Sequence, residues 1–140
     1  MAALNQWVHT LHVKAEPAIY RPLDPAVAAE RMATELREGA MRAWLAFLVE
    51  EAVGMVRCEH VEREATAHAH PRSYVEVHEL VVDPSVRRQR VGRGLMDAAE
   101  GWAAELGVEV QLTCMGFNGG ARRFYEELGY EVVSTRLRKR

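Results

Sequence analysis

The sequence predicts an α/β fold of the mixed α+β kind, in which a central mixed sheet carries helices on its faces. The 140 residues are 49% apolar and no Pro-, Gly- or Ser-rich linker divides them, so we expect residues 1–140 to form one domain with one core. Helix-type and strand-type segments alternate through the second half of the chain. This order excludes a helical bundle and a β-sandwich.

Two helices are predicted before the first strand. Apolar residues spaced three and four apart predict a helix over residues 4–15; they are Leu4, Trp7, Val8, Leu11 and Ala15. Asp24 followed by Pro25 is typical of an N-cap and a first helical residue. Gly39 is a suitable end for this second helix.

A β-hairpin and a third strand follow. The apolar content and the shorter period predict strands over Ala43–Glu50 and Val53–Glu62, with Gly54 as a possible bulge. The segment Tyr74–Val82 is rich in β-branched residues and ends at Asp83, which precedes a proline. The first two strands are close enough in sequence to pair as a hairpin.

Four more elements complete the expected order. They are a helix over Val91–Leu106, a strand over Val108–Cys114, a helix after Asn118 and a last strand over Tyr130–Leu137. Gly107 and Gly129 stand where the two helices should end, because glycine readily adopts the left-handed conformation of a C-terminal cap. Asn118 is a good N-cap for the second of them.

The composition excludes several classes of protein. Eighteen basic against twenty acidic residues give a net charge of −2, which argues against a nucleic-acid binder. The sequence shows no apolar run long enough to span a membrane and no secretory signal, so we expect a cytoplasmic protein without a membrane partner. Cys58 and Cys114 have no metal-binding spacing, and neither do His60, His68 and His70, so no metal is expected.

The stretch from residue 79 to 96, ELVVDPSVRRQRVGRGLM, is the part of the sequence that points most clearly to a binding site. It joins a strand to a helix through two glycines and four arginines. The unpaired N–H groups and the dipole of a helix N-terminus attract an anion, so this pattern predicts a phosphate cradle. The alternative is a surface loop with solvated arginines. The stretch lacks both the phosphate-loop pattern GxxxxGK[ST] and the dinucleotide fingerprint GxGxxG, which disfavours a nucleotide phosphate binder.

Two motifs resemble the GNAT superfamily of N-acetyltransferases. The stretch just described resembles that family's acyl-CoA-binding motif, Q/R-x-x-G-x-G/A, and FNGGARRFYEELGYE resembles its next motif, N-x-x-A-x-x-F/L-Y-x-x-x-G-F. The resemblance runs from Ala43 to the C-terminus. It implies a GNAT-like, mostly antiparallel sheet that here lacks the family's usual first strand. Arg90 stands where the first glycine of the motif usually lies, and its side chain is tolerable only if the backbone torsions there suit a non-glycine residue.

The resemblance also implies where acetyl-CoA binds. The strands containing Val82 and Val108 should splay apart, and the pantetheine arm should bond to the backbone of one of them. The implied binding residues are Leu80, Val81, Val82, Arg87, Arg88, Gln89, Arg90, Val91, Gly92, Arg93, Gly94, Asn118, Ala121 and Tyr125.

Acid and base candidates come from two segments. The resemblance implies that Tyr125 protonates the leaving thiolate, although this tyrosine is also a reasonable core aromatic. A base must take a proton from the attacking amine, and His78 or Glu76 of the third strand is suitable. Period-two alternation places these two on one face and Glu79 on the other. Alternatively these groups hold a water relay or merely cover a half-exposed strand.

The expected function is N-acetyltransfer from acetyl-CoA to a primary amine of a small molecule or peptide, by direct transfer. The alternative is a non-catalytic acyl-CoA-binding regulatory module. The sequence does not identify the substrate, whose pocket we expect between Lys14–Asp24 and the first hairpin.

A homodimer is also expected. The absence of the first strand leaves a sheet edge to be covered, and the helix Leu4–Ala15 carries Trp7 and Leu11. The alternative is that this helix packs on its own sheet.

Overall fold

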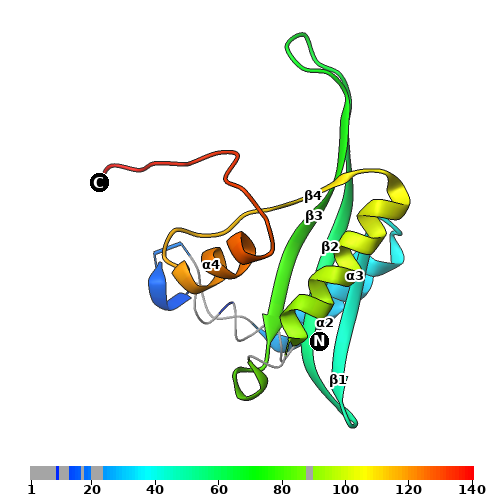
Figure 1. Cartoon of the computed structure of the whole chain (residues 1–140), viewed down its shortest axis with the longest axis vertical. Coiled ribbons are helices and arrows are strands. Elements are labelled where there is room, and N and C mark those ends of the chain that lie inside the picture. The colour runs from blue at the N-terminus through cyan, green and yellow to red at the C-terminus, as the bar shows by residue number, and fades with distance from the viewer. Residues whose placement is uncertain (1–8, 10–12, 17, 20–23, 88–89) are drawn as a thin grey trace.

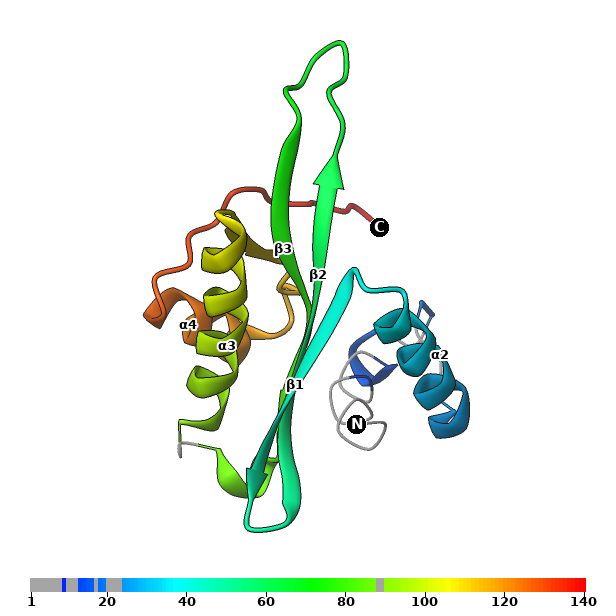
Figure 2. The same cartoon turned by 90° about the vertical axis from the view of Figure 1, so that its right-hand side faces the viewer.

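The computed structural model describes residues 9, 13–16, 18–19, 24–87 and 90–140. Its centre is a four-stranded sheet in the order β1-β2-β3-β4. The helix α3 (Val91–Leu106) lies on one face and α2 (Pro25–Arg37) on the other, as Figure 2 shows (see also Figure 1). The predicted fold class, a mixed and mostly antiparallel sheet flanked by helices, is confirmed.

Local signals set the ends of α2 as predicted. The Asp24 carboxylate accepts the backbone N–H of Ala26 at 2.9 Å, which satisfies one of the unpaired donors of the first turn. Gly39, just past the helix, has φ +83°. The predicted helix over residues 4–15 lies mostly outside the described residues. Within this range, His9 and residues 13–15 are described, and they are helical.

The predicted hairpin forms from β1 (Met41–Leu48) and β2 (Glu51–Arg63). The register shifts beside the predicted bulge, because Ala46 faces Gly54 whereas the next residue faces Ala52. Gly54 is required for packing: a Cβ there would lie 2.9 Å from side-chain atoms of Val91 and Leu95. The glycine therefore lets the first turns of α3 lie directly on β2.

The strand β3 (Arg72–Val82) pairs antiparallel to β2 and parallel to β4 (Glu109–Leu112). The crossover between the two parallel strands contains α3, which Gly107 ends with φ +70° as predicted. β4 ends at Leu112, two residues before the predicted boundary.

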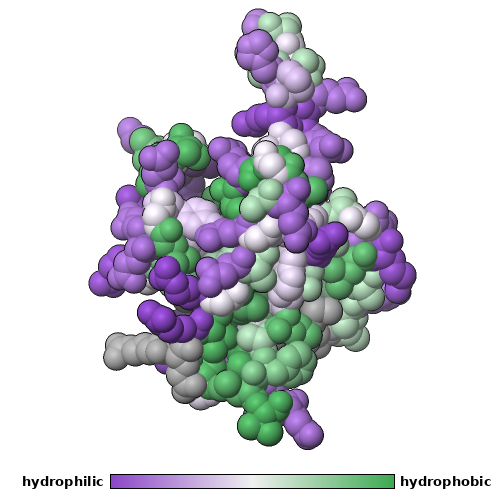
Figure 3. All heavy atoms as spheres, turned by 45° about the vertical axis from the view of Figure 1, so that its right-hand side comes forward, coloured by the Kyte–Doolittle hydropathy of each residue, from purple (hydrophilic) through white to green (hydrophobic). Residues whose placement is uncertain are grey.

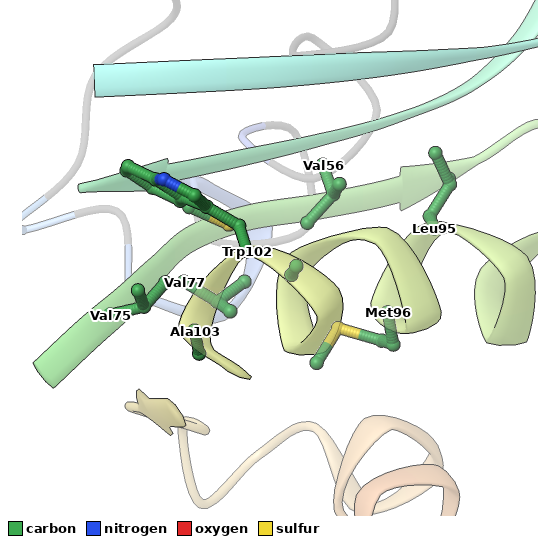
Figure 4. Close-up of a cluster of buried hydrophobic side chains, with 9 residues drawn as sticks. Val56, Val75, Val77, Leu95, Met96, Trp102 and Ala103 are labelled. Carbon is green, nitrogen blue, oxygen red and sulfur yellow. The ribbon is translucent and has the colours of Figure 1, made fainter. Parts of the chain in front are cut away.

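The core lies between the sheet and α3 (Figure 4). Side chains of α3 pack on those of β2 and β3; the buried members are Val56, Cys58, Val75, Val77, Leu95, Met96, Ala99, Trp102 and Ala103. On the opposite face Met32 of α2 packs on Met55 and Val81 in a smaller cluster. The middle of β2 and β3 is thus covered on both faces.

The predicted last strand, Tyr130–Leu137, is wrong. After α4 (Gly119–Glu127) the chain is extended but pairs with no strand of the described residues. Val133 and Leu137 remain 83% and 88% exposed, and Arg138 and Arg140 pair with Glu16. The alternating pattern of this segment reflects a local preference for extended backbone, but a β-strand also needs a neighbouring strand to pair with.

Candidate active site

The parallel pairing of β3 and β4 stops partway along β3. It runs from Tyr74 opposite Glu109 to Val77 opposite Leu112, whereas β3 continues to Val82. Beyond Leu112 the chain leaves the sheet toward α4 (Figure 1). The backbone of β3 from His78 to Val82 therefore has no partner strand on this side among the described residues. The expected splay is present, but it lies after Leu112 and not near Val108, where the strands are about to pair.

The N-terminus of α3 follows the open end of β3. A short 3-10 turn, Pro84–Val86, makes the connection, and Asp83 caps it by accepting the N–H of Ser85 at 2.9 Å. No side chain in the described part of the chain caps the start of α3. The first N–H groups of this helix are available to an anion, as the phosphate-cradle interpretation requires.

Arg90 is the N-cap of α3 and has φ 62° and ψ 15°, in the left-handed region. The condition that these torsions suit a non-glycine residue is therefore not met. This conformation costs a residue with a side chain about 1–2 kcal/mol. The cost gives a physical reason for the glycine of the family motif at this position. Here an exposed arginine takes the strained conformation beside the candidate phosphate site.

The other cradle residues differ in surroundings. A Cβ on Gly92 would lie 3.3 Å from Phe124 of α4, so this glycine allows close packing between the two helices. Gly94 has no atom within 4 Å of such a Cβ and is open to approach. Arg87 and Arg93 are exposed, whereas residues 88 and 89 (Arg88 and Gln89) lie outside the described residues.

Tyr125, the candidate acid, lies on α4 on the α3 side of the sheet. Its ring makes edge contacts with Phe124 and Tyr130 at centroid distances of 5.2 and 5.8 Å. Burial, with smaller effects of Cys114 and Cys58, raises its pKa above the usual 10. The hydroxyl therefore keeps its proton at neutral pH, which suits a proton donor. Asn118 accepts the N–H of Ala121 at 3.1 Å, so both residues are engaged in capping α4.

A bulge in β3 arranges the base candidates. Arg57 of β2 faces Glu79 and Cys58 faces Val77, which leaves His78 as the extra residue. His78 Nε2 lies 2.7 Å from Glu59 Oε2, and Arg57 Nε lies 3.4 Å from Glu79 Oε2. Because Arg57 and Glu59 are two apart on β2, all four side chains share one face. The prediction that Glu79 points away from His78 is wrong, since a bulge interrupts the alternation.

The same face carries the link to α2. Arg57 is buried, at 8% exposure, and Nη1 donates to Glu35 Oε2 of α2 at 2.5 Å. Glu76 lies directly opposite Glu59 in the ladder. Sequence reasoning did not find Glu35, Arg57 or Glu59 as members of this region. A correct register between β2 and β3 was the signal needed, because it places Glu59 opposite Glu76.

The structure thus places the candidate acid and base on opposite faces of the sheet. Tyr125 is on the α3 side, whereas Glu76 and His78 are on the α2 side (Figure 2). His78 is the first residue of β3 after its pairing with β4 ends. A group lying along the unpaired edge of β3 is accessible from both faces.

The described residues contain no group of three or more His, Cys, Asp or Glu side chains arranged around a metal position. His60 is engaged by Ser73, with Nε2 2.7 Å from the serine Oγ. No helix in this part of the chain is long and apolar enough to cross a membrane.

Several solved structures of similar shape are described as acetyltransferases. A mutant of the BH1408 protein from Bacillus halodurans has a TM-score of 0.91 at 22% identity, over 99% of this chain and 90% of that one. The aminoglycoside 6'-N-acetyltransferase AAC(6')-IG from Acinetobacter haemolyticus has a TM-score of 0.71 at 19% identity, over 84% and 81%. AAC(6')-Iy in complex with CoA has a TM-score of 0.65 at 17% identity, over 79% and 86%. At these identities the likeness shows the fold alone.

Sequence relatives identify the family. A mycothiol acetyltransferase from Propionibacterium freudenreichii subsp. shermanii is 30% identical over 118 residues, which are 84% of this chain. The match covers 37% of that relative's length. The profile of the acetyltransferase (GNAT) family matches residues 5–130. The chain belongs to the acetyltransferase (GNAT) family.

Proposed function

We propose that residues 1–140 form one N-acetyltransferase domain, which moves an acetyl group from acetyl-CoA to a primary amine by direct transfer. The observation that carries the proposal is the end of the β3–β4 ladder at Val77 and Leu112, beside His78. No strand among the described residues pairs with this edge of β3, and the N-terminus of α3, which no described side chain caps, comes next among the helices and strands after a 3-10 turn. A ligand with an amide-containing arm and a phosphate end could therefore place its arm along the edge of β3 and its phosphate at the N-terminus of α3.

The residues present fit acetyl-CoA. The backbone of Leu80, Val81 and Val82 is available to bond to the pantetheine amides, since no described strand pairs with β3 beside them on this side. The first N–H groups of α3 attract phosphate, and the exposed Arg87, Arg90 and Arg93 add positive charge. Open space at Gly94 permits close approach.

In the proposed reaction the base acts on the attacking amine and the acid acts on the leaving sulfur. A base on the α2 face, His78 or Glu76, takes a proton from the ammonium form of the substrate. The free amine attacks the thioester carbonyl carbon, the C–S bond breaks, and Tyr125 gives its proton to the departing thiolate sulfur. The new amide nitrogen then loses its extra proton to solvent, and the Tyr125 phenolate takes up a proton, so the hydroxyl is restored. Because burial raises the pKa of Tyr125, the phenol is a donor and not a phenolate at neutral pH.

A small-molecule amine is the favoured acceptor, with a peptide amine as the other class. The relatives are named for small molecules, mycothiol and aminoglycosides. The carboxylates on the α2 face also suit a cationic acceptor, since Glu59 and Glu76 face each other there.

A panel of small amines and short peptides tests the proposal. Each is mixed with acetyl-CoA, free thiol is followed, and the acetylated product is identified by mass spectrometry. We expect thiol release with at least one amine, and calorimetry should show acetyl-CoA binding that weakens with salt because arginines meet phosphates. Absence of CoA binding at low salt contradicts the whole proposal. Binding without turnover would instead identify the non-catalytic acyl-CoA-binding module.

We also propose that two copies associate. In the described sheet β1 is an outer strand, and Phe47 and Val49 are 57% and 100% exposed near its end. Figure 3 shows apolar side chains gathered at the lower end of the molecule, where the β1–β2 turn lies. Light scattering at tens of micromolar protein should give twice the 15.8 kDa of one chain. A mass of one chain contradicts the dimer.

A further inference from the structure

We propose that Glu59 is a positioning residue, which orients His78 and leaves its Nδ1 as the atom that takes the proton from the amine. The inference rests on the proposed acetyl transfer and selects His78 from the two base candidates. It stands on the contact between Glu59 Oε2 and His78 Nε2 at 2.7 Å. This contact joins neighbouring strands, β2 and β3, at the place where β3 loses its other partner strand.

The bulge makes this pairing selective. Without an extra residue in β3, His78 would lie opposite Arg57. The bulge instead places Glu79 opposite Arg57 and moves His78 toward Glu59. Arg57 is held by Glu35 and Glu79, while Glu59 contacts the imidazole. These contacts thus form two sets on this face, Arg57 with Glu35 and Glu79, and His78 with Glu59.

The chemistry of the pair determines which ring nitrogen is basic. An ionised carboxylate only accepts hydrogen bonds, so Nε2 must carry a proton to donate to it. In the neutral imidazole Nδ1 then holds the lone pair. When Nδ1 takes a proton from the amine, directly or through one water, the imidazolium remains hydrogen-bonded to the Glu59 carboxylate. The carboxylate therefore stabilises the product of the proton transfer and holds the ring at one angle.

The position of the ring fits the role. His78 directly follows Val77, the last residue of β3 that pairs with β4, so its imidazole lies where a thioester along the open edge would begin. Both side chains of the pair are partly exposed, at 36% and 38%, and an amine can reach them from solvent. Other charged groups share this face: Glu35 of α2, Arg57 of β2, Glu76 and Glu79 of β3, and Glu109 of β4. Of these, Glu76 is the carboxylate directly opposite Glu59.

The variant Glu59→Gln tests the inference, because it keeps the size of the side chain and removes the charge that selects the tautomer. We expect kcat to fall by about 10- to 100-fold, with KM for acetyl-CoA unchanged. The acidic limb of the kcat profile should also move, since the base has lost its anionic partner. Glu59→Asp keeps the charge and should recover part of kcat. In a His78→Ala background Glu59→Gln should change kcat less than about twofold, because the two residues act as a unit.

Glu62→Gln is the matched control. It removes one negative charge from the same strand, on the opposite face and at an exposed position, and should leave kcat and the pH profile unchanged. Circular dichroism melting of each variant separates loss of fold from loss of chemistry. A ¹⁵N NMR spectrum of the His78 ring adds a readout that needs no substrate. At neutral pH we expect the Nε2–H tautomer in the wild type and a mixture in Glu59→Gln.

The outcomes separate the inference from the proposed function. If the wild type acetylates amines and Glu59→Gln matches its kcat and pH profile, Glu59 is not a positioning residue and only the inference fails. An Nδ1–H tautomer in the wild type overturns it as well. If the wild type binds acetyl-CoA but acetylates no amine, the proposed function fails and the role of His78 as a base fails with it.

Discussion

Arg57 of β2 and Glu35 of α2 form an ion pair that ties the helix to the sheet beside the candidate base residues. The guanidinium is buried, whereas the carboxylate is partly exposed and also meets Arg31 at 2.8 Å. The same guanidinium bonds to Glu79 next to the bulge. The ion pair therefore adds to the apolar contacts of Met32 in fixing α2 over this face.

Glu35→Gln should lower the free energy of unfolding by about 2 kcal/mol, because a buried guanidinium loses an anionic partner. Urea unfolding at neutral pH measures the loss, with the m-value unchanged. Arg31→Gln is the control: its side chain is 74% exposed, and removal of its pair with Glu35 should cost less than about 0.5 kcal/mol. Equal losses of unfolding free energy in Glu35→Gln and Arg31→Gln would show that the buried contact with Arg57 stabilises the protein no more than the exposed contact with Arg31.

Arg90→Gly should stabilise the protein by about 0.5–1 kcal/mol, because glycine adopts the left-handed conformation of this N-cap without strain but adds freedom to the unfolded chain. Thermal unfolding checks this. Arg93→Gly removes the same charge inside the first turn of α3, where glycine should be destabilising by about 1 kcal/mol. A destabilised Arg90→Gly variant would mean that the arginine side chain makes contacts that outweigh the strain.

Tyr125→Phe should lower turnover by about 100-fold, since it removes a proton donor and keeps the ring. Acetyl-CoA affinity should change little. Tyr130→Phe is the matched control, because the Tyr130 hydroxyl donates to Glu100 at 2.9 Å and joins the end of α4 to α3. That variant should lose about 1 kcal/mol of stability but keep its turnover. Turnover of Tyr125→Phe within twofold of the wild type, for every substrate, would contradict the acid role.

Stability should fall as the solution becomes alkaline. Burial raises the pKa of the Cys58 thiol from 9.0 to about 12, so the native state keeps a proton that the unfolded state loses. The resulting stability is fully present below pH 9 and is lost as the pH rises toward 12, by up to about 1.4 kcal/mol per pH unit. Between pH 9 and 10 the tyrosines contribute little, because their ordinary pKa is 10.0.

Cys58→Ala tests this dependence through urea unfolding at pH 8 and at pH 10. The variant should be less stable than the wild type at pH 8, owing to the lost packing, but should lose less further stability at pH 10. Cys114→Ala is the comparison: burial also raises the pKa of this thiol, but it is only half-buried, so its share of the slope should be smaller. A pH dependence unchanged by Cys58→Ala would contradict the assignment.

Signals a few residues long determined which segments are helices and where they end. Asp24 caps α2 with its own carboxylate, and Gly107 and Gly129 take positive φ just after α3 and α4. The two motifs likewise located the start of α3 and Tyr125, because they are read within one segment. Such features depend on torsions and on hydrogen bonds between near neighbours, so the sequence by itself was enough to predict them.

The tertiary structure alone decided how the strands meet. The bulge that brings Glu59 to His78, the end of the ladder at Leu112 and the unpaired tail after Tyr130 all depend on residues far apart in the chain. A register shift of one residue leaves local propensity almost unchanged but sends each side chain to the other face. Composition and periodicity therefore predicted the strands of this sheet, while the contacts that build its candidate site were settled only by packing against α2 and α3.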